Sequence, residues 1–322
     1  MAAEPLPVII DTDCGRDDFM AIAFLLARRD VQIEAITVAN GLAHVGAGAG
    51  NVLRLAEMGG HSRLPVYIGR GTPMHGEAAF PEPWRKNSDE ILHGLLVPEA
   101  LHAPEEQPAA DYLASRLRNR RRPVRILALG PLTNLAEALE RMPGALNGVE
   151  VVIMGGAVRV PGNLGEGGAF HTNNKTAEWN LFVDPVAAER VFAAGARIRL
   201  IPLDATNEVP VDAAFLRNLG AQAQTPLGRF VHDLVARECD FQDGATCYAW
   251  DALAAAALVD PSVVRMRPLA IEIKQSPPEA GRTEEIRGQK PNTEVALAAD
   301  AARFRRIYVG AFTRADSTGA GL

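Results

Sequence analysis

The sequence predicts an α/β protein with a single domain built on an open, mainly parallel, doubly wound sheet. Short β-branched and apolar runs alternate with helical stretches along most of the chain, and turn residues separate them. No internal repeat or linker divides the 322 residues, of which 48% are hydrophobic and 22% charged. That apolar content suffices for one sizeable core. We therefore expect a Rossmann-like sheet with helices on both faces.

The strand and helix signals follow one another in order. The apolar run after Val8 predicts a strand, and the stretch 19–26 directly after it predicts a helix. The next run, IEAITVA, is rich in β-branched residues and ends at the turn signal Asn40-Gly41. Further strands are expected at residues 65–68, 124–129, 149–154, 198–203, 269–274 and 293–298. Further helices are expected at residues 47–58, 109–117, 132–141, 185–194, 213–219 and 227–238, from Asp251 onward, and at 303–313.

Two long segments lack regular periodicity. Residues 69–98 carry Gly, Pro, His and Trp, and residues 157–180 contain the glycine-rich LGEGGAF. Loops of this length inside a compact domain are usually lids or binding loops. We expect the domain to span residues 1–314, with a disordered tail at 315–322.

Charge and composition narrow the class of partner. The net charge is −6 and the isoelectric point about 5.7, so a broad cationic face for nucleic acid is not expected. The start of the chain, MAAEPLP, has no basic or apolar region typical of a signal peptide, and the apolar run 20–27 is too short to cross a bilayer. The three cysteines cannot all pair. We expect a cytoplasmic protein with neither a nucleic-acid nor a membrane partner.

Four carboxylates stand where the first strand gives way to a helix. They are Asp11, Asp13, Asp17 and Asp18, within VIIDTDCGRDD. Open α/β sheets bind their ligands at the carboxyl ends of strands. Four acids this close repel one another, and a hard cation such as Ca²⁺ or Mg²⁺ would relieve the repulsion by binding their oxygens. The structural alternative is one Asp that caps the helix beside solvated loop acids.

Polar residues also follow other expected strands. Asn40 follows the second strand, Leu129-Gly130 ends a middle one, and Asp251 opens a late helix after a polar loop. In a doubly wound sheet these ends meet at one crevice. The sequence has neither a Ser-His-Asp arrangement nor a phosphate-binding glycine loop with its Lys. Acyl transfer and P-loop chemistry are therefore disfavoured.

Motifs spread over nearly the whole chain resemble the nucleoside hydrolase family. They are DTDCGRDDF, LGPLTNLA, MGG, AEWNLFVDP and KPNTEV, in the family's order. The resemblance implies the open-sheet fold of that family and Ca²⁺-dependent hydrolysis of the N-glycosidic bond of ribonucleosides. It also implies a homodimer or homotetramer.

The resemblance assigns metal-binding and catalytic roles by position. Asp13 matches the residue that binds the metal and takes a proton from the attacking water. Asp18 matches a bidentate metal ligand, Asp251 a distal carboxylate ligand, and the Leu129 carbonyl a neutral ligand. Asp11 would orient these ligands by hydrogen bonding without touching the metal, or it would simply be a buried strand-end Asp that accepts hydrogen bonds from backbone N–H groups.

The same resemblance implies the contacts to the sugar. Asp17 and Asn180 match residues that bind the ribose hydroxyls. Glu178 and Asn163 match contacts toward the 3′ and 5′ positions of the ribose.

Aromatic residues point to the base that leaves. Pyrimidine-accepting and broad family members have His before the distal Asp, whereas this chain has Trp250 there. Trp84 and Trp179 also stand where the purine-specific branch has aromatic residues, although Gly15 replaces that branch's Asn. Stacking favours the larger purine ring. The resemblance thus implies inosine, adenosine and guanosine as substrates and a role in purine salvage.

Some alternatives stay open. Asn40 is a candidate base contact, or else a turn residue; His93 and Tyr248 are weaker candidates near the base. The enzyme would alternatively have broad or pyrimidine specificity. A phosphatase of the haloacid dehalogenase type also places DxD after its first strand, but Gly15 departs from that motif. A non-catalytic nucleoside-binding module is the remaining alternative.

Overall fold

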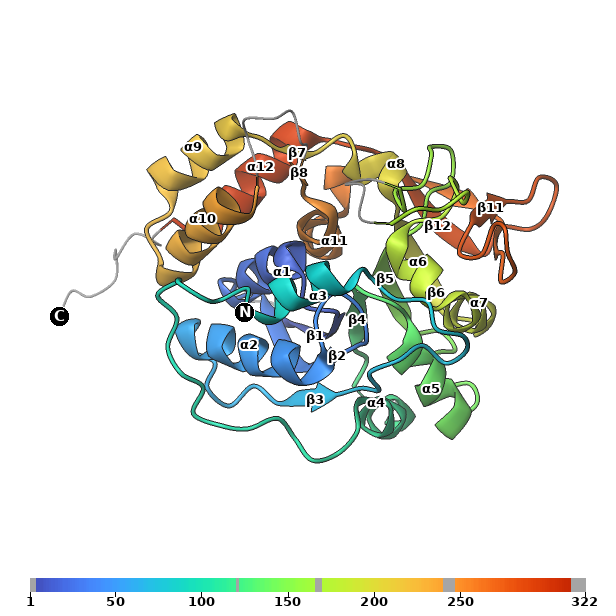
Figure 1. Ribbon diagram of the computed structural model, residues 1–322, viewed down its shortest axis with the longest axis horizontal. Coiled ribbons are helices and arrows are strands. Elements are labelled where there is room, and N and C mark those ends of the chain that lie inside the picture. The colour runs from blue at the N-terminus through green and yellow to red at the C-terminus, as the bar shows by residue number, and fades with distance from the viewer. Residues whose placement is uncertain (1–3, 120–121, 166–169, 240–246, 314–322) are drawn as a thin grey trace.

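The computed structural model describes residues 4–119, 122–165, 170–239 and 247–313. Its centre is an eight-stranded sheet in the order β3-β2-β1-β4-β5-β6-β12-β9 (Figure 1). Neighbouring strands are parallel except at the edge, where β9 runs antiparallel to β12. The order 3-2-1-4-5-6 of the first six strands is that of dinucleotide-binding doubly wound sheets. The predicted fold class is confirmed.

The bounds of the elements are as follows. The strands are β1 Leu6–Thr12, β2 Val31–Val38, β3 Val66–Ile68, β4 Arg125–Ala128, β5 Glu150–Met154, β6 Arg197–Ile201, β7 Pro210–Val211, β8 Cys247–Tyr248, β9 Val264–Leu269, β10 Ile271–Ile273, β11 Thr283–Glu285 and β12 Thr293–Ala299. The helices are α1 Arg16–Leu26, α2 Val45–Met58, α3 Glu82–Asp89, α4 Ala109–Arg118, α5 Thr133–Arg141, α6 Trp179–Val183, α7 Pro185–Ala193, α8 Leu203–Thr206, α9 Ala213–Gln222, α10 Pro226–Glu238, α11 Trp250–Val259 and α12 Ala301–Gly310, with a short 3₁₀ turn at Pro261–Val263.

The sheet separates two layers of core. Alternate residues of β1 point to opposite faces: Val8 and Ile10 pack with buried residues of α1, α2 and α11, whereas Ile9 packs with those of α4, α5 and α7. Figure 1 shows α4, α5 and α7 along one side of the sheet and α1, α2 and α11 along the other. Because both faces are covered, the strands are near-continuous apolar runs, which is why the sequence revealed them.

An additional helical layer covers α1. The Tyr308 ring, on α12, stacks with Phe24 of α1 at a centroid distance of 5.3 Å, and its hydroxyl donates to the Met20 carbonyl at 2.9 Å. Tyr308 is fully buried. Helix α1 is thus held between the sheet and the C-terminal helices, so the acidic residues at its start have a rigid support.

Two expectations about the elements were wrong. The segment 69–98 contains the helix α3, which the pattern did not reveal because Ser88 is its single buried residue and so it has no apolar stripe. The strand expected at 269–274 is two strands, β9 and β10, which lie in different sheets. The tail 315–322 and residues 240–246 lie outside the described residues.

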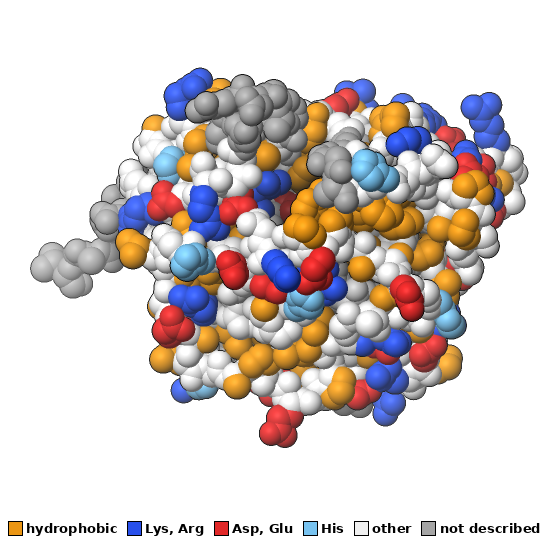
Figure 2. Space-filling view, in the orientation of Figure 1, with side chains coloured by type: hydrophobic (Ala, Val, Ile, Leu, Met, Phe, Trp, Pro, Cys, Tyr) orange, Lys and Arg blue, Asp and Glu red, His pale blue; other side chains and the backbone are white. Residues whose placement is uncertain are grey.

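The described surface is chemically mixed. Figure 2 shows acidic and basic side chains interspersed over one face, together with a contiguous hydrophobic band. Within the described ranges, no helix has the length and apolar character needed to cross a bilayer.

Candidate active site

The predicted site residues gather at the point where the strand order reverses. Strand β1 lies between β2 and β4, and the segments that follow β1 and β4 leave the sheet beside each other. A cavity of about 400 Å³ opens there. The predicted residues that line it are Asp13, Asp17, Asp18, Trp84, Leu129, Asn163, Glu178, Trp179, Asn180, Trp250 and Asp251.

The turn between β1 and α1 fixes Asp18. Cys14 has a left-handed backbone with φ of 65°, which is uncommon for a residue with a side chain and folds the chain back sharply. The Gly15 N–H then donates to Asp18 Oδ2 at 2.9 Å, and the Thr12 hydroxyl donates to Asp18 Oδ1. Asp18 therefore caps its own helix and has a fixed orientation.

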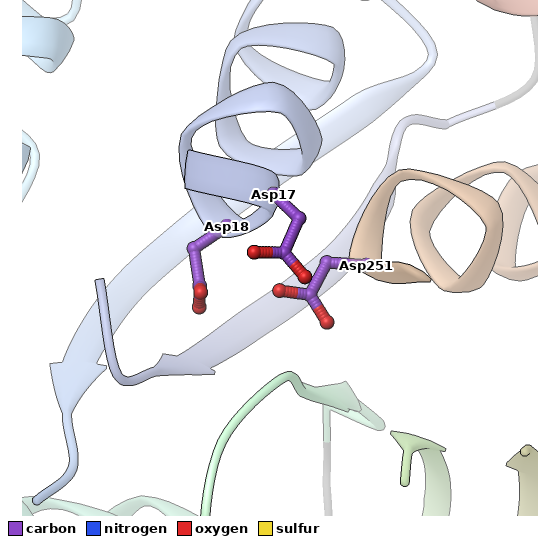
Figure 3. Close-up of side chains that lie close together, drawn as sticks. All are labelled: Asp17, Asp18 and Asp251. Carbon is purple, nitrogen blue, oxygen red and sulfur yellow. The ribbon is translucent and has the colours of Figure 1, made fainter. Parts of the chain in front are cut away.

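Three carboxylates meet in this cavity. Asp17 and Asp18 project from the first turn of α1, and Asp251 projects from the first turn of α11 (Figure 3). One oxygen of each lies within 4.8 Å of the others. Asp13 lines the same cavity, and its Oδ2 accepts from the Leu42 N–H at 2.9 Å. The structure thus brings acids from distant parts of the chain together.

Burial raises the pKa of each of these acids. The pKa of Asp17 rises to about 6 through burial and the charge of Asp18. For Asp251, burial followed by the charges of Asp18 and Asp17 raises the pKa well above its usual value. The pKa of Asp13 is also raised, by burial and by Asp18. The cluster is costly to ionise without a compensating positive charge.

The donor set fits a hard divalent cation. Asp251 Oδ1 is buried and has no hydrogen-bond partner in the described part of the chain, so it is an acceptor without a donor. Several carboxylates within one small, buried space provide the oxygen ligands that Ca²⁺ or Mg²⁺ prefers. A bound cation would satisfy this oxygen and offset the repulsion.

Glycines allow other backbone segments to approach Asp13 closely. A Cβ atom at Gly41 would lie 2.1 Å from Asp13 Oδ2, and one at Gly130 would lie 2.7 Å from Asp13 Cβ. Both glycines follow sheet strands, β2 and β4. Their lack of a side chain is what lets the Asp13 carboxylate sit between the two strand ends.

Glu178, Asn180 and Asn163 line the cavity as well. The Glu178 carboxylate accepts from the N–H groups of Asn180 and Gly156, each at 2.9 Å, and burial raises its pKa to about 7. Asn180 Nδ2 donates to the Leu129 carbonyl at 2.8 Å. This bond orients the carbonyl predicted as a neutral metal ligand, while a second lone pair stays available.

All three tryptophans line the cavity from different helices. Trp84 comes from α3, Trp179 from α6 and Trp250 from α11. Trp179 stacks on Phe80 at 4.8 Å and meets the edge of Trp84 at 5.5 Å. Trp250 Nε1 is buried and without a partner among the described residues. The cavity therefore combines an acidic centre with aromatic walls.

Other predicted residues lie elsewhere. Asn40 and Asp11 are buried but are not among the lining residues; Asp11 accepts hydrogen bonds from Thr37 and Asn134. His93 is exposed on a loop, and Tyr248 packs against Trp250 with ring centroids 5.7 Å apart.

The sequence reasoning missed Arg16, Asn87 and Glu238, which also line the cavity. Arg16 stands inside the acidic motif, which was a signal that went unused. No sequence signal marked Asn87 and Glu238, because they lie near polar helix ends that only the fold brings to the cavity.

A family comparison decides the class of protein. The model of the family described as inosine-uridine preferring nucleoside hydrolase matches residues 8–306. The chain belongs to this family. The resemblance seen in the sequence is thereby confirmed, and the phosphatase alternative falls away. The protein is a nucleoside hydrolase, an enzyme of the class that hydrolyses N-glycosyl bonds.

Individual nucleoside hydrolases are similar to it over most of their length. The pyrimidine-specific ribonucleoside hydrolase RihA of Salmonella enteritidis PT4 is 32% identical over 237 residues, or 73% of this chain and 71% of RihA. The structure of a plant nucleoside hydrolase matches with a TM-score of 0.83 at 28% identity, covering 97% of this chain and 100% of the plant one. An inosine-guanosine nucleoside hydrolase matches with a TM-score of 0.80 at 25% identity, covering 95% and 98%.

Replacing Asp251 by Asn should stabilise the metal-free form of this nucleoside hydrolase and weaken the stabilisation of the form that binds Ca²⁺. Folding raises the pKa of Asp251, so the ionised Asp251 carboxylate destabilises the metal-free protein at pH 8. This destabilisation shrinks as the pH falls toward the pKa that Asp251 has in the unfolded chain. Asp251→Asn should thus raise the metal-free melting temperature at pH 8 by about 2 °C or more. The gain should diminish at pH 5, and stabilisation by added Ca²⁺ should weaken.

Thermal melts with chelator or with Ca²⁺ measure both effects. Asp300→Asn is the matched control, since Asp300 caps α12 outside the cavity and Asn caps equally well. A lower metal-free melting temperature for Asp251→Asn at pH 8 would contradict the proposed repulsion.

Gly41→Ala should impair the position of Asp13. The new methyl group would overlap the Asp13 carboxylate, so kcat should fall by at least about 100-fold if Asp13 is the base. Gly50→Ala, in the middle of α2 where a Cβ meets nothing within 4 Å, is the control and should keep full activity. Steady-state kinetics of both variants test this; equal activities would show that the close approach is not needed.

Proposed function

We propose that this nucleoside hydrolase is a purine nucleosidase that uses Ca²⁺ and releases the free base and ribose. The observation that carries the proposal is one cavity lined by a buried carboxylate cluster and by all three tryptophans. We further propose a homodimer or homotetramer with a role in purine salvage, as the family resemblance implies, and a cytoplasmic location, as the cysteines suggest.

The acidic centre would hold the metal. Asp13, Asp18 and Asp251 supply carboxylate oxygens, and the Leu129 carbonyl supplies a neutral ligand. Asp17, whose carboxylate lies in the same group, is close enough to share a ribose hydroxyl with this centre. When bound, Ca²⁺ supplies positive charge that keeps these acids ionised and polarises water.

Asp13 acts as the general base. The bond between C1′ and the base nitrogen breaks with both electrons leaving on the base, and C1′ passes through an oxocarbenium-like state. As the water oxygen bonds to C1′, Asp13 accepts the water proton. The Leu42 N–H, 2.9 Å from Oδ2, holds the carboxylate in place for this transfer.

Polar residues of the cavity bind the sugar. Asp17 and Asn180 contact the ribose hydroxyls, and Glu178 and Asn163 contact its 3′ and 5′ side. The N–H groups that point at Glu178 fix its orientation from behind. Its raised pKa, about 7, allows Glu178 to donate a hydrogen bond to a ribose oxygen when it is protonated and to accept one when it is ionised.

Aromatic walls favour a purine. Trp250 replaces the His that pyrimidine-accepting members carry, and it has no hydrogen-bond partner that would hold it away from a ligand among the described residues. Stacking of a base on an indole contributes about 1–3 kcal/mol and grows with ring area. A purine offers two fused rings to Trp250 and Trp84, whereas a pyrimidine offers one.

Pyrimidine nucleoside hydrolysis is the second candidate. The 32% identical RihA bears a pyrimidine-specific name, whereas the name of the inosine-guanosine enzyme indicates purines. Overall similarity thus leaves the base open, and the residues of the cavity must decide it. The tryptophan walls favour the purine.

A nucleoside panel tests metal and base together. We expect kcat/KM for inosine to exceed that for uridine at least about 10-fold, consistent with the stacking energy. Activity should vanish with a chelator and return with Ca²⁺. Equal values would establish broad specificity, and uridine-favouring values would establish the pyrimidine alternative. Tight inosine binding without turnover would establish a binding module.

Trp250→Ala should lower turnover of inosine more than of uridine. If the indole helps the purine to leave, the loss should fall mainly on kcat, by about 10-fold for a stacking loss of 1–2 kcal/mol. Val259→Ala, at the other end of α11, is the control for the helix itself. An unchanged kcat for inosine would refute the role.

A further inference from the structure

One cation faces the acidic cavity. Among the described residues that line it, Arg16 alone carries a fixed positive charge. It is the first residue of α1, next to Asp17, and its guanidinium carbon lies 5.8 Å from the centre of the Trp250 ring. Nothing in the mechanism above uses this group.

Arg16 is held from two further helices. Its Nη1 donates to the Glu238 carbonyl at 3.4 Å, at the end of α10. The Glu238 carboxylate in turn accepts from Asn87 Nδ2 of α3 at 2.9 Å. Arg16 is thus positioned between α3, α10 and α11, on the side of the cavity that carries Trp250.

We propose that Arg16 reads the acceptor edge of the base and makes the enzyme prefer 6-oxopurine nucleosides, inosine and guanosine, over adenosine. The inference rests on the proposed function, which places the purine against Trp250. Arginine offers five donors and no acceptor. Hypoxanthine and guanine present acceptors at O6 and N7, which suit its fork, whereas adenine presents an amino donor beside N7.

The same contact assists departure of the base. When the C1′–N9 bond breaks, the electron pair leaves on the base and its charge spreads toward N7 and O6. Hydrogen bonds from the guanidinium strengthen as this charge grows, so they stabilise the transition state more than the bound substrate. Arg16 keeps its proton because its pKa is too high to release it. The base takes its proton from solvent after it has left.

A simpler role would be to neutralise the acids, since the charge of Arg16 lowers the pKa of Asp17, opposing the effects that raise it. The two roles predict different substrate dependence. Loss of a base contact affects substrates according to their leaving group, whereas loss of charge near Asp17 affects all substrates alike.

The test compares Arg16→Leu, Arg16→Lys and the wild type on inosine, guanosine, adenosine and 4-nitrophenyl riboside, whose leaving group needs no assistance. We expect Arg16→Leu to lower kcat/KM for inosine and guanosine by about 10- to 100-fold, as for a lost bidentate contact. Adenosine should lose much less, and the nitrophenyl substrate least. Arg16→Lys should not restore the ratio of kcat/KM for inosine to that for adenosine, because the lysine ammonium lacks the paired donors of a guanidinium.

Arg28→Leu is the matched control. Arg28 also lies over an aromatic ring, with its guanidinium carbon 5.2 Å from the centre of Phe24, but it is outside the cavity. Equal losses on all four substrates, full rescue by Arg16→Lys, or no loss in Arg16→Leu would each overturn the inference. The inosine-to-uridine ratio of the wild type tests the proposed purine preference separately.

Discussion

The repulsion among buried carboxylates is the constraint on which this site depends. Asp17, Asp18 and Asp251 place oxygens within 4.8 Å of one another, and Asp18 and Asp251 are buried while Asp17 is partly exposed. Burial and mutual charge raise their pKa values, so the folded chain stores unfavourable energy there. A bound hard cation would offset that cost. The rigid support of α1 by Tyr308 and the sheet keeps the acids from moving apart.

Close backbone approach completes the centre. The left-handed turn at Cys14 brings Asp18 back onto its own helix start, and Gly41 and Gly130 leave room for Asp13 between two strand ends. The hydrogen bond from Asn180 aims the Leu129 carbonyl. The close approaches to Asp13 and the hydrogen bond from Asn180 join segments far apart in the chain, whereas the turn at Cys14 is local. The centre is therefore a property of the strand order rather than of any single motif.

Aromatic side chains line the same cavity as the acids. Helices α3, α6 and α11 each bring one tryptophan to the cavity, and Arg16 adds donors on the Trp250 side. In the proposed function, Glu178 and Asn180 would contact the sugar, and the tryptophans would contact the base.

The sequence by itself determined the alternation of strands and helices and the acidic motif after β1, because β-branched runs buried on both faces and clustered acids leave local patterns. It missed α3, which buries a single residue and so has no apolar stripe, and the edge strand β9. Only the tertiary structure decided that Asp251 meets Asp17 and Asp18, and that Arg16 lies beside Trp250. Those neighbours depend on how α1 packs against α11, and no local pattern records the packing of two helices more than two hundred residues apart.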